Sequence, residues 1–316
     1  MRRKRIKKPK LIVIVGPTAS GKTSWSLRMA KKINGAIISA DSRQIYKKMD
    51  IGTAKEKGEW RRVGLKKEYF VDGIKHYLVD FVDPGQQFTA VDWRDKAFKY
   101  IKLCYKNKQQ PIVVGGTGLY LSALVDNYSI PKIPANKKLR ESLSEKSAVE
   151  LYHRLETLDT ETAAVIDKNN KRRLILALEV SILSGEPYSM QRLKGEPSFD
   201  CLKIGIEVER EELHSRIEAR VDNMIKIGLM EEVKALIRQG YAWSLPSMSG
   251  IGYKQFKEYL ENKITREEVA ANLKRDTKRY AKRQMTWFSR DKSIKWCRNY
   301  EQAEKLALDF VRIPHS

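Results

Sequence analysis

The chain has 316 residues, of which 41% are hydrophobic and 32% are charged, with 62 Lys and Arg against 39 Asp and Glu. This composition is typical of a soluble globular protein, and because no apolar run approaches the width of a bilayer, we expect neither a membrane-spanning helix nor a secretory signal after the basic residues 2–8. The net charge of +23 favours a polyanionic partner such as nucleic acid, since like charges repel one another within a compact fold. A basic surface that is merely solvated is the alternative.

The predicted strands are short apolar runs at residues 11–15, 36–40, 77–80 and 112–114, followed by weaker ones at 203–208 and 294–297. Residues 23–34 and 91–106, which lie between strands, are predicted to be helical. Apolar strands that alternate with helices are typical of a parallel sheet covered on both faces. The sequence therefore predicts an α/β fold with a doubly wound, mostly parallel sheet.

The middle of the chain has a different pattern. From about residue 127 to residue 197 it shows mainly helical periodicity, as in the spacing of Leu151, Leu155 and Leu158. Prolines lie at the edges of this segment, Pro131 among them, where they end elements. We interpret it as a small helical domain inserted between two parts of the sheet domain, residues 1–126 and 198–316, the second of which ends in a basic helical region.

The three cysteines, Cys104, Cys201 and Cys297, lie far apart, and none belongs to a Cys-x-x-Cys pair. This usage indicates neither a disulfide framework nor a zinc site. We therefore expect a protein of the reducing cytoplasm.

The first predicted strand runs directly into the sequence GPTASGKT, which fits the pattern G-x-x-x-x-G-K-[ST] of a phosphate-binding loop. Glycines let successive N–H groups turn toward one oxyanion, and the N-terminus of the following helix adds its positive end. Lys22 supplies an ammonium group, and the Thr23 hydroxyl can bind Mg²⁺ or a phosphate oxygen. The residues predicted to bind phosphate or diphosphate are Gly16, Thr18, Ala19, Ser20, Gly21, Lys22 and Thr23. Such loops are most common in ATP-binding and other nucleotide-binding enzymes, so a kinase or ATPase is the first alternative.

The second predicted strand is followed by Asp41, Ser42, Arg43 and Gln44. In a doubly wound sheet the carboxyl end of a strand beside the loop strand faces the ligand crevice, so we expect Asp41 beside the phosphates. A diphosphate would repel a carboxylate there unless the carboxylate acts as a base or reaches a metal ion. Asp is also a preferred helix cap, and the residues alone leave both interpretations open.

These motifs resemble those of the tRNA dimethylallyltransferases, also called tRNA isopentenyltransferases, and further matches follow in the order of that family. They lie at residues 39–46, 49–55, 76–80, 114–120, 172–180, 213–233, 250–253 and 279–288. One departure is Leu176, where the family usually has Arg. Another is the segment 59–73, which is longer and more basic than usual and to which the resemblance assigns no role.

The resemblance implies transfer of a dimethylallyl group from dimethylallyl diphosphate to the exocyclic amine of the adenine adjacent to the anticodon in tRNA, with release of diphosphate. It implies Mg²⁺ as cofactor at Thr23 and Asp41 as the base that accepts the amine proton. Lys22, Thr23 and Arg220 would stabilise the charge that develops on the leaving diphosphate. Arg216 lies one helical turn from Arg220 and would help to bind the donor. For both arginines a solvated basic stripe is the alternative.

We expect the tRNA to contact the loops after two strands, the inserted domain and the basic C-terminal region. Thr117 would fix the acceptor ribose or phosphate and Gln44 the adenine edge, although both could be turn or capping residues. The expected tRNA-binding residues are Asp41, Ser42, Arg43, Gln44, Thr117, Arg140, Arg172, Arg173, Arg279 and Arg283, with the last two outside the chemical site. Tyr280, Trp287 and Phe288 are interleaved with basic residues, and we interpret them as core residues.

Three alternatives stand beside this interpretation. A P-loop kinase of a small molecule would use residues 78–80 as its Walker B strand. A prenyltransferase of free adenine nucleotides would not require the long basic C-terminal region. An RNA-binding module without activity would not require an intact Lys22, Thr23 and Asp41. We expect a cytoplasmic monomer without a membrane partner.

Overall fold

The computed structural model describes residues 8–127, 133–134, 136–191 and 195–312, so residues 2–7 of the basic N-terminal segment and Pro131 lie outside the described part of the chain. The chain divides into two compact units. One contains the residues up to Leu121 and those from Ser198 onward, and the other runs from Ser122 to Pro197. The larger unit carries the phosphate-binding loop.

The larger unit is built on an eight-stranded sheet with the strand order β3-β4-β5-β2-β6-β1-β7-β8. The pairs from β5 through β8 are parallel, and the pairs that involve β3 and β4 with their neighbours are antiparallel. The bounds are β1 (Lys10–Val15), β2 (Gly35–Ser39), β3 (Glu59–Val63), β4 (Lys66–Val71), β5 (Ile74–Tyr77), β6 (Gln110–Gly115), β7 (Asp200–Ile206) and β8 (Lys295–Cys297). The predicted α/β class with a mostly parallel, doubly wound sheet is confirmed.

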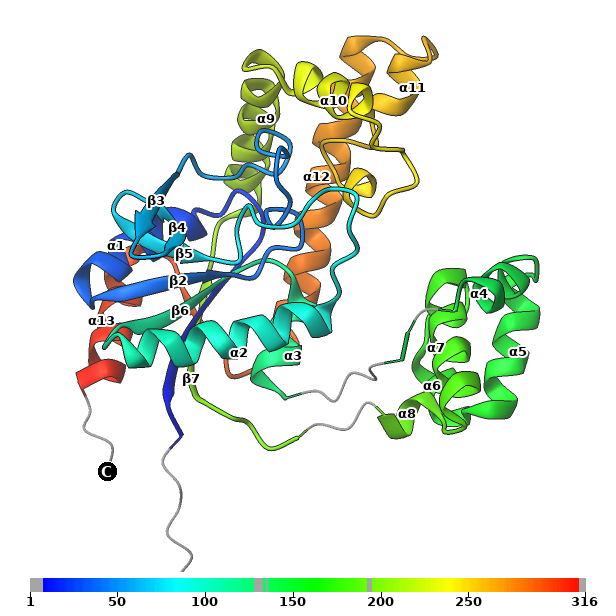
Figure 1. Cartoon of the computed structure of the whole chain (residues 1–316), viewed down its shortest axis with the longest axis horizontal. Coiled ribbons are helices and arrows are strands. Elements are labelled where there is room, and N and C mark those ends of the chain that lie inside the picture. The colour runs from blue at the N-terminus through cyan, green and yellow to red at the C-terminus, as the bar shows by residue number, and fades with distance from the viewer. Residues whose placement is uncertain (1–7, 128–132, 135, 192–194, 313–316) are drawn as a thin grey trace, which may run out of the picture. The chain divides into compact units, whose positions relative to one another are not determined.

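Helices cover both faces of this sheet. On one face α1 and α13 bury Met29, Ala30 and Ala303 against apolar residues of β1, β6 and β7. On the other face α2 packs Trp93 completely out of solvent, and the indole of Trp93 donates a hydrogen bond to the Ser39 carbonyl at 2.8 Å. Figure 1 shows α2 crossing this face. The bounds are α1 (Lys22–Lys32), α2 (Ala90–Lys106), α3 (Gly118–Val125) and α13 (Tyr300–Arg312).

A layer of helices lies beyond the carboxyl ends of the parallel strands (Figure 1). It consists of α9 (Arg210–Lys226), α10 (Leu229–Arg238), the short helix η1 (Ser247–Ser249), α11 (Phe256–Leu260) and α12 (Arg266–Phe288). Its core joins Val221, Val233 and Leu273 of the helices to Ile45 and Met49 of the loop after β2. The layer therefore forms one wall of the crevice that the sheet opens at its carboxyl edge.

The strand predicted at residues 77–80 is wrong, because β5 ends at Tyr77. Leu78 and Asp80 adopt left-handed backbone with φ angles of 62° and 56°, which is incompatible with a strand. Asp80 is held there by hydrogen bonds from the Lys55 ammonium at 2.8 Å and the Trp60 indole at 3.1 Å. Residues 78–80 therefore do not form the Walker B strand that the kinase alternative requires.

The antiparallel hairpin of β3 and β4 is the part of the sheet that the sequence pattern missed. All five residues of β3 are exposed, so the strand has no alternation of apolar and polar residues to reveal it. Hydrogen bonding across register pairs from Glu59 with Phe70 to Val63 with Lys66 defines it instead.

The smaller unit is a bundle of short helices around its own core of leucines, Leu143, Leu151, Leu155, Leu174 and Leu178 among them. The bounds are α4 (Lys137–Ser144), α5 (Ala148–Leu158), α6 (Thr160–Val165), α7 (Lys171–Ser184) and α8 (Tyr188–Gln191). An ion pair joins α4 to α7, since the partly exposed Arg140 guanidinium lies 2.8 Å from the buried Glu179 carboxylate.

Candidate active site

Residues 16–23 form a turn between β1 and α1 that exposes backbone N–H groups. Gly16 and Gly21 have φ angles of 154° and 92°, values that side chains with a Cβ rarely allow, and Ala19 between them has a φ of 64°. No side chain caps the N-terminus of α1. Its first N–H groups therefore remain available for an anion.

Lys22 is folded back into its own loop. Its ammonium donates hydrogen bonds to the carbonyl oxygens of Gly16 at 3.0 Å and Pro17 at 2.6 Å. Burial lowers the pKa of Lys22 to about 7, the Asp41 carboxylate opposes this shift, and the Arg220 guanidinium adds to it. The three charged groups thus interact around one loop.

No helix follows Asp41, so it is not a helix cap; its side chain fixes a turn and leaves one carboxylate oxygen free. Oδ1 accepts hydrogen bonds from the N–H groups of Arg43 at 2.8 Å and Gln44 at 3.3 Å, which fixes the turn after β2. No residue in the described part of the chain donates a hydrogen bond to Oδ2. The residue itself lines a cavity, so its role in the turn leaves it available as a base.

That cavity has a volume of about 280 Å³ and lies among the loop after β1, the loop after β2, α9 and α12. Thr18, Asp41 and Arg220 face it together. Its remaining lining residues are Ser42, Arg43, Gly52, Thr53, Ala54, Val221, Met224, Ser249, Gly250, Ile251, Gly252, Lys254, Leu273, Thr277, Tyr280 and Arg283. Segments from across the sequence therefore meet around one cavity.

The two arginines of α9 separate in the structure. Arg220 reaches the loop, with its Nη1 3.4 Å from the Thr18 hydroxyl, and burial lowers its pKa. Arg216 instead forms an ion pair with Glu212 at 2.5 Å and does not line the cavity. Of the pair expected at the donor, the structure brings only Arg220 to the loop.

The polar residues after β2 and β6 are largely engaged with the protein itself. The Thr117 hydroxyl accepts a hydrogen bond from the Ser42 N–H at 3.1 Å, and the Gln44 amide donates to the carbonyl oxygens of Thr53 and Ala54 at 3.3 and 3.2 Å. The Arg43 guanidinium donates to the Pro246 carbonyl at 2.5 Å. These side chains hold the cavity wall in place, as the turn interpretation expects.

Two residues that the sequence analysis missed organise the cavity wall. The Gln284 side chain of α12 accepts a hydrogen bond from the Thr18 N–H at 2.8 Å and donates one to the Gly116 carbonyl at 3.0 Å. The Glu232 carboxylate of α10 accepts hydrogen bonds from three successive N–H groups, those of residues 50, 51 and 52, at 2.8 to 3.0 Å. Gln284 lies in the quoted family segment at residues 279–288, which was the available signal for it.

The aromatic and basic residues of α12 divide between core and surface. Phe288 is buried as predicted. Trp287 is 40% exposed and packs over Gly118. Tyr280 lines the cavity. The core interpretation was therefore wrong for Trp287. Arg279 is exposed, but Arg283 also lines the cavity, contrary to the expectation that it lies outside the chemical site.

In the smaller unit Arg172 and Arg173 are exposed in the first turn of α7. Leu176 is 43% exposed on the same helix. Arg140 differs from these residues, because its guanidinium is committed to the buried Glu179. The structure therefore leaves two of these three arginines without an acidic partner among the described residues.

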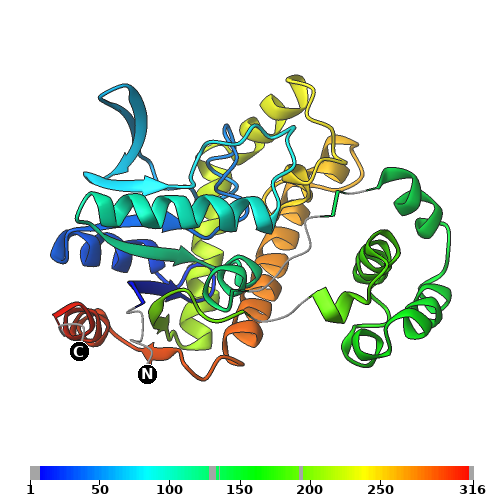
Figure 2. The same cartoon turned by 60° about the horizontal axis from the view of Figure 1, so that its bottom comes forward.

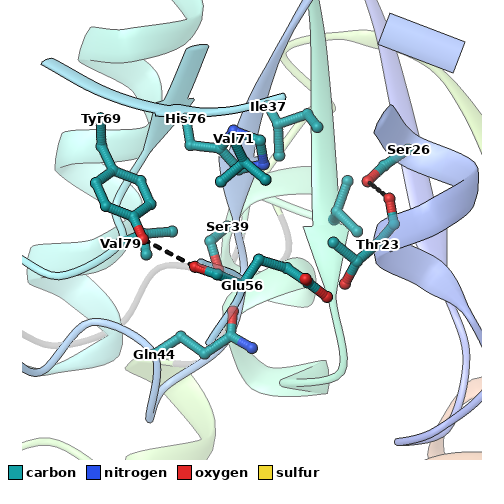
Figure 3. Close-up of a pocket in the computed structure, with 11 residues that line it drawn as sticks. Thr23, Ser26, Ile37, Ser39, Gln44, Glu56, Tyr69, Val71, His76 and Val79 are labelled. Carbon is teal, nitrogen blue, oxygen red and sulfur yellow. Dashed lines mark hydrogen bonds between the residues drawn. The ribbon is translucent and has the colours of Figure 1, made fainter. Parts of the chain in front are cut away.

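A second, smaller cavity of about 40 Å³ is lined by Thr23 (Figure 3). Thr23, Gln44 and Glu56 line it, together with apolar residues of β2, β4 and β6. Figure 3 shows the Glu56 carboxylate pointing toward Thr23. Oxygen donors of this kind suit a hard divalent cation such as Mg²⁺. The sequence analysis did not identify Glu56.

Three features define a P-loop enzyme that acts on a phosphate ester. They are a phosphate loop without a side-chain cap on a mostly parallel sheet, a carboxylate oxygen that has no donor among the described residues, and the half-buried Arg220 guanidinium that faces the same cavity. No helix in the described ranges is both long and apolar enough to cross a membrane.

The chain belongs to the IPP transferase family, whose model matches residues 44–291. The isopentenyl transferase model also matches residues 9–76. The chain is 44% identical to the tRNA dimethylallyltransferase of Pelotomaculum thermopropionicum, over 97% of this chain and 96% of the relative. It is 43% identical to the tRNA dimethylallyltransferase of Clostridioides difficile, over 97% of each. The family predicted from the motifs is confirmed.

Solved structures agree. The chain is similar to the full-length tRNA isopentenylpyrophosphate transferase of Bacillus halodurans, with a TM-score of 0.69 and 35% identity over 98% of this chain and 100% of that one. It is also similar to a eukaryotic dimethylallyltransferase described as acting on tRNA, with a TM-score of 0.75 and 26% identity over 96% of this chain and 77% of that one.

Proposed function

We propose that the chain transfers a dimethylallyl group from dimethylallyl diphosphate to the exocyclic amine of the adenine next to the anticodon in tRNA. The observation that carries the proposal is the cavity in which Asp41 and Arg220 face the Thr18 side of the phosphate loop. Membership of the IPP transferase family and the names of the relatives support it.

The donor diphosphate binds in the loop. The free N–H groups of the turn and of α1 hold its oxygens, while Lys22 exchanges its hydrogen bonds to Gly16 and Pro17 for bonds to the anion. As the C1–O bond breaks, negative charge grows on the leaving diphosphate and positive charge is delocalised over the allyl group. Lys22 from within the loop and Arg220 from α9 stabilise that growing charge.

A Mg²⁺ ion fits the oxygen donors beside the loop. The Thr23 hydroxyl and the Glu56 carboxylate, which line one small cavity, would hold it together with oxygens of the diphosphate. When bound, the ion supplies further neutralisation of the charge on the leaving group.

The acceptor adenine occupies the larger cavity, which it reaches by leaving its stack in the anticodon loop. The amine nitrogen forms a bond to C1 of the allyl group while the C1–O bond breaks, and the amine then loses one proton. Oδ2 of Asp41 accepts this proton, and Oδ1 continues to hold the turn. A carboxylate is a weak base toward a neutral amine, so the transfer follows or accompanies bond formation.

The tRNA backbone contacts exposed basic residues of two units, Arg279 on α12 and Arg172 and Arg173 on α7. The net charge of +23 favours this polyanionic partner. The enzyme acts in the cytoplasm as a monomer.

The test is mass spectrometry of nucleosides from tRNA incubated with the protein, dimethylallyl diphosphate and Mg²⁺. The expected product is an adenosine heavier by one dimethylallyl group in place of a hydrogen, at the position next to the anticodon. Calorimetric titrations with ATP and dimethylallyl diphosphate accompany it. Unmodified tRNA together with tighter binding of ATP than of the prenyl donor would contradict the proposal and favour a kinase.

A further inference from the structure

We infer that the hairpin of β3 and β4 is an additional tRNA-binding arm, which contacts the phosphate backbone beside the catalytic crevice. This inference rests on the proposed function for its substrate. The hairpin lies within residues 59–73, the segment that the family resemblance leaves without a role. Figure 2 shows it standing at one end of the sheet.

The register of the sheet directs the tip of the hairpin toward the edge that carries the active site. Tyr69 pairs with His76, and His76 pairs with Ile37 of β2, so these three residues lie at one level of the sheet. From Ile37, β2 runs toward Asp41. Because β4 is antiparallel to β5, the residues from Tyr69 back to Lys66 extend in that same direction. The tip at residues 63–66 therefore extends toward the carboxyl edge of the sheet, the edge that also carries the loops after β1 and β2.

The base of the hairpin is fixed to the protein body. Tyr69 is 6% exposed, and its hydroxyl donates to the Glu56 carbonyl at 2.8 Å. The ring of Trp60 packs edge-on against Tyr69 with 5.4 Å between centroids, and its indole N–H bonds to Asp80. Ala54, five residues before the hairpin, already lines the acceptor cavity. The extended chain from Ala54 to the tip at Gly64 spans at most about 36 Å, so the tip lies within that distance of the cavity wall at Ala54.

The tip has the chemistry of a polyanion-binding surface. Residues 61–67 read RRVGLKK, with four basic residues and no acidic one. Arg61 is paired with Glu59, whereas Arg62, Lys66 and Lys67 have no acidic partner within the described residues. Leu65 between them is 95% exposed, so it can contact sugars or an unstacked base.

Basic residues on an exposed edge strand have a second use, because charge prevents strands of different molecules from pairing. The two explanations differ in what removal of the charge would do. If the charges only protect the edge, their loss increases aggregation and leaves tRNA affinity unchanged. If they bind tRNA, their loss weakens binding and lowers its dependence on salt.

The test uses two triple variants. The hairpin variant is Arg62→Gln/Lys66→Gln/Lys67→Gln, and the control is Lys31→Gln/Lys102→Gln/Lys106→Gln. The control loses the same charge at exposed positions of α1 and α2 that have no acidic partners among the described residues. Binding of full-length tRNA is measured from low to high salt. We expect the hairpin variant alone to bind more weakly at low salt, with a slope of log affinity against log salt flatter by about 2–3 units for three lost phosphate contacts. Its affinity for dimethylallyl diphosphate and its turnover at saturating tRNA should match those of wild type.

An unaltered salt slope in the hairpin variant would overturn the inference, as would an equal loss in the control. Aggregation with unaltered tRNA affinity would assign the charges to edge protection. Binding of the tip to anionic vesicles, without an effect on tRNA binding, would assign it to a membrane surface. Either outcome would also overturn the inference. If the triple variant misfolds, as judged by loss of donor binding, the single exposed substitution Lys67→Glu replaces it. Failure of the wild-type protein to modify tRNA would contradict the proposed function, and this outcome is distinct from the outcomes of the binding test.

Discussion

The side chain of Gln284 accepts a hydrogen bond from the backbone N–H of Thr18 at 2.8 Å, across 266 positions of the sequence. Gln284 is only 5% exposed, and its amide also donates to the Gly116 carbonyl. One residue of α12 thus joins the phosphate-binding loop to the loop after β6. The shape of the donor site consequently depends on the helical layer as well as on the sheet.

Replacing Gln284 with Ala or Met should leave both backbone groups buried without partners. We expect the free energy of unfolding to fall by about 1–3 kcal/mol, together with weaker binding of dimethylallyl diphosphate. Met keeps the length of the side chain, so equal losses in the two variants would identify the hydrogen bonds and not a cavity as the cause. Denaturant unfolding and calorimetry measure both quantities, and unchanged values would show that the loop holds its shape without α12.

The two roles of Asp41 can be separated by Asp41→Asn. The amide oxygen still accepts hydrogen bonds from Arg43 and Gln44, so stability and tRNA affinity should change little, but the base is lost. Turnover should fall by about 10²–10⁴. Asp41→Ala removes the hydrogen bonds of the turn as well and should also lower the melting temperature. Turnover of the Asn variant within a few-fold of wild type would leave Asp41 with a role in the turn alone and place the base elsewhere.

Donor binding should weaken as pH rises above 7. Burial lowers the pKa of Lys22 to about 7 in the free enzyme, whereas a bound diphosphate favours the ammonium form and raises that pKa. Binding above pH 7 therefore takes up a proton, and affinity should fall by up to about tenfold per pH unit until the pKa of the complex is reached. Calorimetry in two buffers of different ionisation enthalpy counts this proton. In Lys22→Arg the charge persists, so a pH dependence that survives in this variant would point to another group.

Glu232 should prove to be an anchor of the cavity wall. Its carboxylate accepts hydrogen bonds from three backbone N–H groups at residues 50–52 and one from the Tyr253 hydroxyl at 2.7 Å. Glu232→Ala should lower the free energy of unfolding by about 1.5–3 kcal/mol. The neighbouring Glu231 is exposed, so Glu231→Ala is the matched control. Equal thermal stability of the two variants would refute this role.

The salt dependence of tRNA binding should report on Arg279, which is exposed on α12 and has no acidic partner among the described residues. Arg279→Ala should flatten the slope of log affinity against log salt by about one unit. Arg275 is a suitable comparison one turn earlier, because its guanidinium already lies 3.4 Å from Asp276. If Arg279→Ala keeps the wild-type slope, this face of α12 is merely solvated.

Much of the fold was predictable because its signals are local. The loop sequence GPTASGKT and the buried run of β1 specify a strand, a turn and a helix through neighbouring residues alone. The parallel sheet follows from apolar strands that alternate with helices. Such patterns depend on backbone geometry and burial within one segment, so the sequence determined the class of the fold and the position of the P-loop in it.

The tertiary structure decided the relationships between distant segments. Only packing directs Arg220 to the loop while Arg216 pairs with Glu212, since the two share one helix face in the sequence pattern. Only sheet register directs the basic hairpin toward the catalytic edge, because β3 is exposed on every residue and has no periodicity to reveal it. Gln284 reaches Thr18 for the same reason: a hydrogen bond between residues so far apart exists only after the chain has folded.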